Sequence, residues 1–277
     1  MNSTTSQYNG NIKIKDALSK YLKTDTPVSV GKMGNSEFIG LLHHVRGLQL
    51  SSSARQLVTV NAGVYPDTDK VLNNFFELYH SSLGTLDIAA KWISGDEDFL
   101  RTINANIEMV ELRSIEPYYH SDPWSSVLEG QSVVVVSPFS STVESQYNKR
   151  ELLWEDKRVL PDFDLHTVQS PYLSLGSGEG GDWFSALDSM YNNVLKKKPK
   201  IVLVGAGAYS LPLISMLKSE GISGVHLGGS NQILFGIKGR RWDNHEVIGG
   251  FYNEHWVRPN GTEIPANKGL IEDGCYW

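Results

Sequence analysis

The sequence predicts an α/β fold in which helices cover both faces of a doubly wound, mostly parallel sheet. Strand-like and helix-like segments alternate through the second half of the chain, and this order is typical of parallel sheets. The apolar runs VVVV (133–136) and IVLV (201–204) are typical of strands that are buried on both faces. The 277 residues, 40% apolar and 20% charged, suffice to bury a large core. We expect one integrated domain over residues 1–277, because no repeat or low-complexity linker divides the chain.

The first third of the chain predicts two helices with one strand between them. Residues 1–10 are polar, and we expect them to be frayed. Over residues 14–22, apolar residues recur at the i, i+3, i+4, i+7 and i+8 positions of an amphipathic helix. The run VSV (28–30) follows Pro27 and predicts a short strand. A second helix should then begin near Ser36.

Residues 68–113 predict helices only. The segments DKVLNNFFELYHSSL (69–83), GTLDIAAKWI (84–93) and EDFLRTINANIEMVEL (97–112) all have apolar residues at spacings of three and four. Such spacing places apolar side chains on one face of a helix. We therefore expect a helical layer or a helical insertion beside the sheet.

The second half of the chain predicts the centre of the sheet. The valine run should form a strand that ends at Ser137 and Pro138, and residues 151–175 contain a further strand within DFDLHTVQS. A glycine-rich loop then leads into a helix. Residues 198–229 follow the order strand, glycine turn, helix and strand.

Composition narrows the classes of function. The formal net charge of −6 argues against a broad nucleic-acid surface, although a small anionic ligand stays compatible with it. The single cysteine, Cys275, excludes an internal disulfide and fits a reducing, cytoplasmic compartment. The first 15 residues contain no apolar signal segment, and no apolar run is long enough to predict a membrane span. A homo-oligomer stays open.

The strand IVLV ends in the turn Gly205-Ala206-Gly207, and a predicted helix follows this turn. Glycines let the backbone approach a ligand closely, and the N–H groups at a helix start attract phosphate. We expect Gly205, Gly207 and Ser210 to lie against a diphosphate. A tight turn without a ligand is the alternative. The full G-x-G-x-x-G pattern is absent and no acidic residue ends the next strand, which disfavours a dinucleotide site.

A second strand exit lies in VHLGGSNQ (225–232). Ligands in open α/β sheets bind beyond the carboxyl ends of strands, so this exit and the first glycine turn should form one crevice. Gly229, Ser230, Asn231 and Gln232 would bring neutral donors and acceptors into it, and we expect the diphosphate to lie near this turn as well as near 205–210. Alternatively, Ser230 only caps the helix that follows.

Positive charge gathers in FGIKGRRWD (235–243). Lys238, Arg240 and Arg241 could bind a diphosphate, because Arg pairs with phosphate through two hydrogen bonds and Lys acts as a point charge. A solvated surface turn would contain the same residues. The exit SPFSST (137–142), with Ser140, offers hydroxyl groups for phosphate or sugar, and helix capping is the alternative there.

Two candidate bases lie outside these turns. Asp182 follows the glycines of GEGGDWF (178–184), which suggests a mobile loop over the site. His255 stands beside Glu254 and could act as a general base, or it could only pack among aromatic residues. The motifs H-E-x-x-H and G-x-S-x-G do not occur, so the sequence offers neither a zincin site nor a hydrolase elbow.

The motif GKMGNSEF (31–38) leaves the first predicted strand and opens the second helix. From Lys32 to Phe38 it resembles R-x-G-D-G-E-F, a motif near the N-terminus of the GT-D type glycosyltransferases. The valine strand with its Ser/Thr exit and residues 200–229 are also similar to parts of that family. The order of these motifs along the chain supports the resemblance more than any one of them does.

The resemblance implies a Rossmann-like fold, a UDP-sugar donor and a D-x-E motif that binds a divalent cation, Mn²⁺ or Mg²⁺, on the diphosphate. Lys32, Gly34, Asn35 and Glu37 occupy the motif positions here. Asn35 replaces the first carboxylate, which removes one formal charge, and hard cations prefer carboxylate oxygens. Cationic side chains, with Lys32 among them, could neutralise the leaving diphosphate in place of the metal.

We therefore expect a glycosyltransferase that moves a hexose or pentose, such as glucose or xylose, from a UDP-sugar to a glycan or glycoprotein. Glu37 would contact the sugar or deprotonate the acceptor hydroxyl. Alternatively, its charge only interacts with the helix dipole. Two other classes stay open. Asn35 would suit a non-catalytic nucleotide-sugar-binding module, and the GAGAYS turn (205–210) would suit a nucleotide-cofactor oxidoreductase or a methyltransferase.

Overall fold

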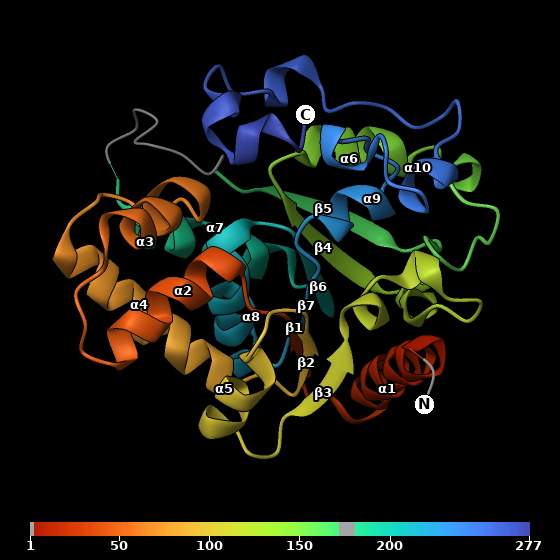
Figure 1. The fold of residues 1–277 in the computed structure, drawn as a ribbon. Helices are drawn as coiled ribbons and strands as arrows, with labels where there is room; N and C mark the ends of the chain where they lie inside the picture. The colour runs from red at the N-terminus through yellow and green to blue at the C-terminus, as the bar shows by residue number, and fades with distance from the viewer. Residues whose placement is uncertain (1–2, 172–180) are drawn as a thin grey trace.

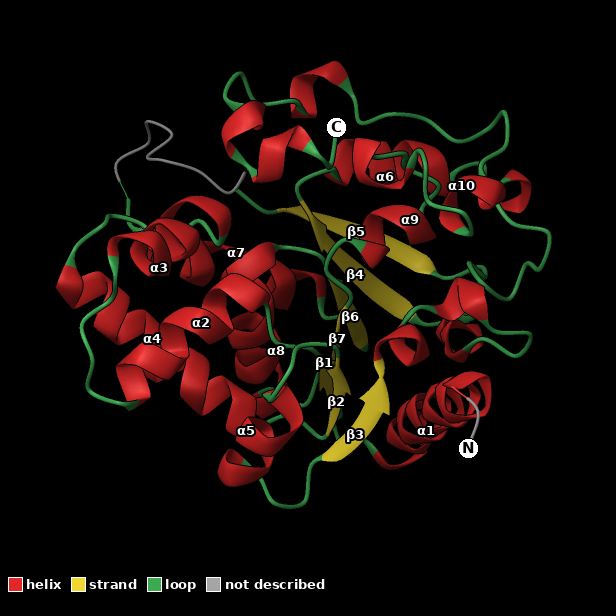
Figure 2. Cartoon of the chain, viewed as in Figure 1, coloured by secondary structure: helices red, strands yellow, loops and turns green. Residues whose placement is uncertain are grey.

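Seven strands form one parallel sheet in the structure, a computed structural model that describes residues 3–171 and 181–277. The strand order is β3-β2-β1-β7-β6-β4-β5, and each neighbouring pair is parallel. Helices lie on both sides of the sheet (Figures 1 and 2), which confirms the predicted fold class. The strands are β1 (Ser29–Gly31), β2 (Ile88–Lys91), β3 (Glu108–Glu111), β4 (Ser132–Ser137), β5 (Asp164–Gln169), β6 (Ile201–Val204) and β7 (Ser223–His226).

Two apolar cores lie on opposite faces of the sheet, one under each helical layer (Figure 1). The first layer contains α2 (Asn35–Val45), α4 (Asp69–Gly84), α5 (Asp96–Ile103), α7 (Trp183–Lys197) and α8 (Ser210–Ser219). The second contains α1 (Ser3–Thr24), α6 (Ser140–Tyr147), α9 (Ser230–Leu234) and α10 (Ile248–Phe251). Every residue of β6 and β7 is buried, because helices cover both faces of these strands.

Shorter elements complete the described chain. The helix α3 (Ser52–Gln56) continues into a π-helical turn, Leu57–Asn61. Single 3-10 turns occur at Leu112–Ile115, Pro117–Tyr119, Trp124–Leu128, Arg150–Leu152, Gly207–Tyr209, Arg240–Trp242, Gly261–Glu263, Lys268–Leu270 and Glu272–Gly274. Among residues 3–171 and 181–277, no helix is both long enough and apolar enough to cross a membrane.

The polar N-terminal segment, expected to be frayed, is helical from Ser3 onward. Its contacts with distant residues explain the difference. The Asn11 amide donates to Asp122 O at 2.8 Å and accepts from the Trp124 N–H at 2.9 Å. The Ser114 hydroxyl donates to the Gln7 carbonyl at 3.1 Å. Polar residues therefore stabilise this helix through tertiary bonds that no local pattern predicts.

The prediction of helices throughout residues 68–113 is partly wrong. Helix α4 is confirmed, but the segment 84–93 contains β2, and α5 is followed by β3. Ala89 and Ala90 of β2 are fully buried between the two helical layers. Short apolar runs fit a buried strand as well as a buried helix, so spacing alone does not separate them. The middle of the chain therefore supplies one edge of the sheet instead of a helical insertion.

The strand exits that the sequence predicted to meet do lie side by side. β1 and β6 lead into α2 and α8 on one face, whereas β7 and β4 lead into α9 and α6 on the other. A crevice opens where neighbouring parallel strands send their connections to opposite faces. A Cβ on Gly205 would lie 2.8 Å from Gly228 O, so the two glycine exits touch.

Candidate active site

The GKMGNSEF segment places a buried carboxylate at the end of β1. Glu37 lies in the first turn of α2 and is only 7% exposed. Its carboxylate folds back over Gly34, where a Cβ would overlap it. The Tyr79 hydroxyl accepts a hydrogen bond from the Gly34 N–H at 3.1 Å and closes the site from α4. The glycine is thus required by the position of the Glu37 side chain.

Glu37 has the protonation behaviour of a base that works near neutral pH. Burial raises the pKa of Glu37 to about 7, against the lowering effects of its own backbone N–H and of Lys32. The Glu272 carboxylate raises this pKa further. Both protonation states are then populated near pH 7, which suits general base catalysis.

Lys32 brings a cation to the same strand exit, close enough to Glu37 for each charge to act on the other's pKa. Its ammonium lies 4.8 Å from the centre of the Trp92 ring, and the indole N–H donates to Met33 O at 2.7 Å. Burial lowers the pKa of Lys32, and the Glu116 carboxylate opposes this shift. Within the parts of the chain that the structure describes, the Lys32 ammonium forms no hydrogen bond or ion pair. An anionic ligand would find this charge free.

Buried residues from β7 and from the segment after β3 complete this side of the crevice. The Ser230 hydroxyl donates to Glu116 Oε1 at 2.6 Å, and Arg113 pairs with Glu116 Oε2 at 2.7 Å. Ser230 is therefore not a helix cap, and that alternative is wrong. His226 Nδ1 lies 3.1 Å from Lys32 O, which can only accept, so this nitrogen carries the proton. Burial lowers the pKa of His226 to about 3, which keeps the ring neutral.

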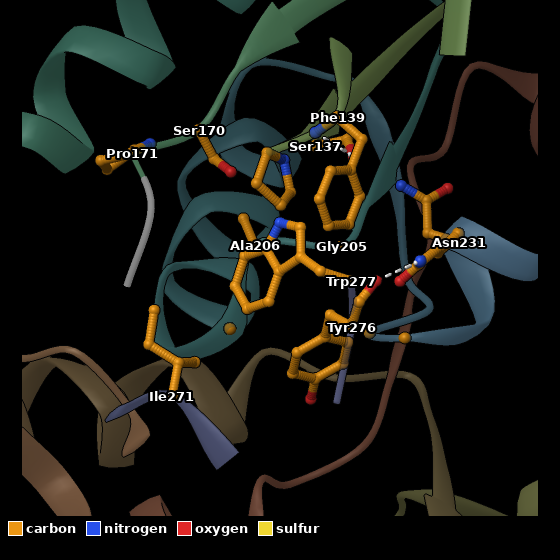
Figure 3. A pocket seen from close by; sticks show the side chains of 15 residues that line it. Ser137, Phe139, Ser170, Pro171, Gly205, Ala206, Asn231, Ile271, Tyr276 and Trp277 are labelled. Atoms are coloured by element: carbon orange, nitrogen blue, oxygen red, sulfur yellow. Dashed lines mark hydrogen bonds between the residues drawn. The ribbon is translucent and has the colours of Figure 1, made fainter. Parts of the chain in front are cut away.

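A pocket of about 100 Å³ opens on the other side of the glycine exits (Figure 3). Its walls come from the ends of four neighbouring strands and from the C-terminal segment of the chain. Gly207 has a φ of +54°, a conformation that favours glycine. The lining residues are 137–139 after β4, 170–171 after β5, 205–207 after β6, 228–229 and 231–232 after β7, and Ile271, Tyr276 and Trp277.

The predicted ligand turns are thus in place, but several of their polar groups already have partners. The Ser210 hydroxyl accepts from the Ala206 N–H at 3.1 Å and stabilises the first turn. The Gln232 amide N–H group donates to Tyr276 O at 2.7 Å, drawn as a dashed line in Figure 3. Gly205, Gly207, Gly229 and Asn231 border the pocket directly.

The three predicted cations do not converge on one point. Lys238 lies over the Tyr252 ring at 5.3 Å, and Arg240 donates to Asp273 O. Arg241 pairs with the Glu272 carboxylate and donates to the Tyr276 hydroxyl at 3.2 Å. Arg241 is nonetheless close enough to Lys32 for its charge to lower the lysine pKa. One arginine of the cluster therefore belongs to the crevice.

The hydroxyl-rich exit of β4 is capped by a distant carboxylate. Glu263 accepts hydrogen bonds from the Ser141 N–H and hydroxyl, both at 2.7 Å, and from the Thr142 hydroxyl. Ser140 instead donates to the Gln169 side chain and does not border the pocket. This helix start is thus satisfied by the chain itself.

The other two candidate bases lie apart from the pocket. Asp182 caps α7, because its carboxylate accepts from the Ser185 N–H and hydroxyl, both at 2.8 Å. These bonds lower its pKa, so it is a weaker base than Glu37. The glycine loop before it, at 172–180, lies outside the described residues. His255 Nε2 lies 3.5 Å from Glu254 Oε1, and His255 is not among the residues that line the pocket.

The divalent cation of the D-x-E motif has a poor donor set here. Asn35 is exposed while Glu37 is buried, and residues two apart on a helix do not face each other. Among residues 3–171 and 181–277, no group of three or more His, Cys, Asp or Glu side chains could hold a metal ion. The residues present do not fit the motif's metal.

Sequence reasoning missed Glu116, His226, Phe139 and Trp277. His226 ends a predicted strand, a position at which Brändén's rule could have found it. Phe139 lies within the strand exit that was singled out for its hydroxyls. Glu116 and Trp277 carry no local signal, because only the tertiary fold brings them to the crevice.

No family model matches this chain, and no curated protein is similar to it. A similar solved structure is titled "Selenomethionine substituted structure of domain of unknown function 1792 (DUF1792)". It shares 13% sequence identity at a TM-score of 0.45, over 94% of this chain and 98% of that chain.

Proposed function

We propose that this chain is a glycosyltransferase that moves a hexose or pentose, such as glucose or xylose, from a UDP-sugar donor to a hydroxyl of a glycan or glycoprotein. The observation that carries the proposal is that the exit of β1 brings together Glu37, a buried carboxyl with a pKa of about 7 that folds back over Gly34, and Lys32, whose ammonium has no hydrogen-bond or ion-pair partner among the described residues. A base and a counter-charge for a leaving diphosphate are the two groups that metal-independent transfer needs.

In the proposed reaction, the acceptor oxygen forms a bond to the anomeric carbon of the donor sugar. The bond between that carbon and the diphosphate oxygen breaks, and its electron pair leaves with UDP. The acceptor proton passes to the Glu37 carboxylate. Lys32 stabilises the negative charge that develops on the leaving diphosphate.

Arg241 would assist Lys32 after exchanging its present partner. Its guanidinium is held by the Glu272 carboxylate, an anion in the place where a phosphate could bind. Arg pairs with phosphate as it does with carboxylate, through two parallel hydrogen bonds. The proposed reaction needs no divalent cation bound to Asn35.

Release of UDP from UDP-glucose and UDP-xylose, with a panel of glycan acceptors, tests the proposal. We expect turnover that persists in EDTA, because Lys32 supplies the counter-charge.

A second candidate is a nucleotide-sugar-binding module without turnover. Asn35 in place of the motif's first carboxylate favours it, and so does the Glu272 carboxylate that already pairs with Arg241. Binding of UDP-glucose without UDP release, with or without Mn²⁺, would select the module.

A further inference from the structure

The pocket and the Lys32 side of the crevice have opposite chemistry. Within the described parts of the chain, the pocket is lined by glycines, apolar residues and neutral polar side chains, with no charged one. Aromatic rings form much of its wall: Trp277 meets Phe139 edge to face at 6.1 Å and Tyr276 at 6.1 Å. Figure 3 shows the Trp277 indole beside Phe139 and Tyr276. Such a surface suits a planar, uncharged ring.

Several buried polar atoms in the same wall have no hydrogen-bond partner among residues 3–171 and 181–277. They are Ser170 Oγ, Asn231 Oδ1 and Gln232 Oε1, on residues that are 1%, 2% and 4% exposed. The orientation of the Gln232 amide is fixed, because its nitrogen donates to Lys238 O at 3.1 Å and to Tyr276 O at 2.7 Å. Its oxygen is therefore an unpaired acceptor buried in the pocket wall. Unpaired buried polar atoms are costly, so a side-chain shift that brings them to the N–H and O–H groups of a ligand would be favoured.

The unpaired atoms come from different strand exits. Ser170 follows β5, whereas Asn231 and Gln232 lie in α9 after β7. Helix α9 begins over the neighbouring strands, because the Asn231 amide nitrogen lies 3.5 Å from Val136 O of β4. A ligand that fills the pocket therefore lies against polar residues from several strand exits.

A single glycine separates the pocket from the free cation. Gly228 borders the pocket, and a Cβ on it would lie 3.4 Å from Lys32 Cε and 3.7 Å from Lys32 Nζ. A ligand that leaves the pocket over Gly228 therefore reaches the ammonium at once. Because this residue is glycine, it has no side chain of its own between the pocket and the ammonium.

We propose that the neutral pocket binds the nucleoside of a nucleoside diphosphate, and that Lys32, across Gly228, binds its diphosphate. The inference rests on the proposed function for the identity of the donor. It keeps the predicted role of Lys32 at the diphosphate, but it differs from the sequence prediction for the 205–210 and 229–232 turns, which were expected to bind the diphosphate. Those turns instead hold the base and ribose, and the charge lies on the β1 side.

Binding of uridine, UDP and inorganic pyrophosphate to three variants tests the division, with saturation-transfer NMR for weak ligands and calorimetry for UDP. Trp277→Ala should weaken uridine and UDP alike by about tenfold, through lost stacking. Ser170→Ala should weaken both by about fivefold, the value of one hydrogen bond. Lys32→Met should weaken UDP and pyrophosphate by about tenfold or more and leave uridine within about twofold.

Ser170→Ala separates a loss of binding from a loss of the fold. Its hydroxyl has no partner in the part of the chain that the structure describes, so its removal should leave the melting temperature unchanged. If Trp277→Ala and Ser170→Ala both leave the affinity for uridine unchanged while the wild-type protein binds UDP, the division of the crevice is wrong and the proposed function still stands. Loss of uridine binding in Lys32→Met equal to the loss of UDP would do the same. A wild-type protein that binds neither uridine nor UDP would overturn both.

Discussion

The crevice has two halves. Loops at strand exits form both of them, but the side chains of the two halves differ in charge. In the β1 half, Lys32 and Glu37 are charged or titrating groups whose pKa values burial shifts toward neutrality. In the pocket half, Phe139, Trp277 and Gln232 present rings and an unpaired amide oxygen, and no charged side chain of the described residues lines it. Both halves include strand exits that contain glycine. The fold thus supplies the crevice, and the side chains that the strand exits and the C-terminal segment bring to it decide its chemistry.

Burial acts in opposite ways in the two halves. In the charged half it raises the pKa of Glu37 to about 7, which suits proton transfer, and it lowers the pKa of Lys32, a shift that a bound anion would oppose. In the neutral half it leaves polar atoms without partners, which favours a ligand that supplies them. One half is suited to reaction and the other to recognition.

The largest expected effect is on turnover, and it comes from the Glu37 carboxylate in the charged half. Glu37→Gln should reduce sugar transfer by about 10²- to 10⁴-fold, the usual contribution of a general base, and leave UDP affinity within about twofold. Steady-state kinetics and calorimetry on the same preparation measure both. Glu129→Gln, which changes an exposed carboxylate, is the matched control and should keep full activity. Equal losses of turnover and affinity would instead place Glu37 in donor binding.

The second prediction concerns stability against pH. The folded pKa of Glu37, about 7, lies above its ordinary 4.5, so burial of the neutral form stabilises the fold fully below pH 4.5. That stabilisation is lost as pH rises to 7, by about 3 kcal/mol. Glu37→Gln, which stays neutral, should therefore unfold at higher denaturant than wild type at pH 8 and equally at pH 4.5. A pH-independent difference would show that Glu37 is not buried as a neutral acid.

The boundary between the halves gives a smaller effect. Gly228→Ala should weaken UDP by about fivefold and uridine by less than about twofold, because the new methyl group meets Lys32 and displaces a phosphate contact. Gly221→Ala is the matched control: both glycines have positive φ, but nothing lies within 4 Å of a Cβ at Gly221. Both variants should lose about 1 kcal/mol of stability through backbone strain. An equal loss of UDP affinity in both would remove Gly228 as a boundary.

The smallest effect lies outside the crevice. Asp182→Ala should cost about 1 kcal/mol of unfolding free energy, the usual value of a helix N-cap, and should leave sugar transfer unchanged. Chemical denaturation and UDP release measure the two quantities. A large loss of transfer at unchanged stability would restore Asp182 as a candidate base.

Features encoded within a few residues could be predicted from the sequence. The glycine exits after β6 and β7 and the start of α2 follow from turn and helix signals that lie next to one another in the chain. The strand β2 could not be predicted, because Ala89 and Ala90 have the burial of a central strand and the spacing of a helix. Its identity depends on parallel pairing with β1 and β3.

The candidate site was predicted less completely than the fold. Glu37 and Lys32 belong to one motif, so the sequence placed them together. Gly205 and Gly229 were assigned to phosphate because glycine turns attract anions in general. The neutral lining of their pocket became visible only when Phe139 and Trp277 were brought together from positions 138 residues apart, 277 minus 139. The charge of a site thus depends on which distant side chains join it.

A crystal structure with UDP bound tests the division of the crevice most directly. The account predicts the uracil ring against Trp277 and within hydrogen-bond distance of the unpaired pocket oxygens, with the diphosphate across Gly228 at Lys32 Nζ. A diphosphate seated among Gly205, Gly207 and Gln232, with the base toward Lys32, would contradict it.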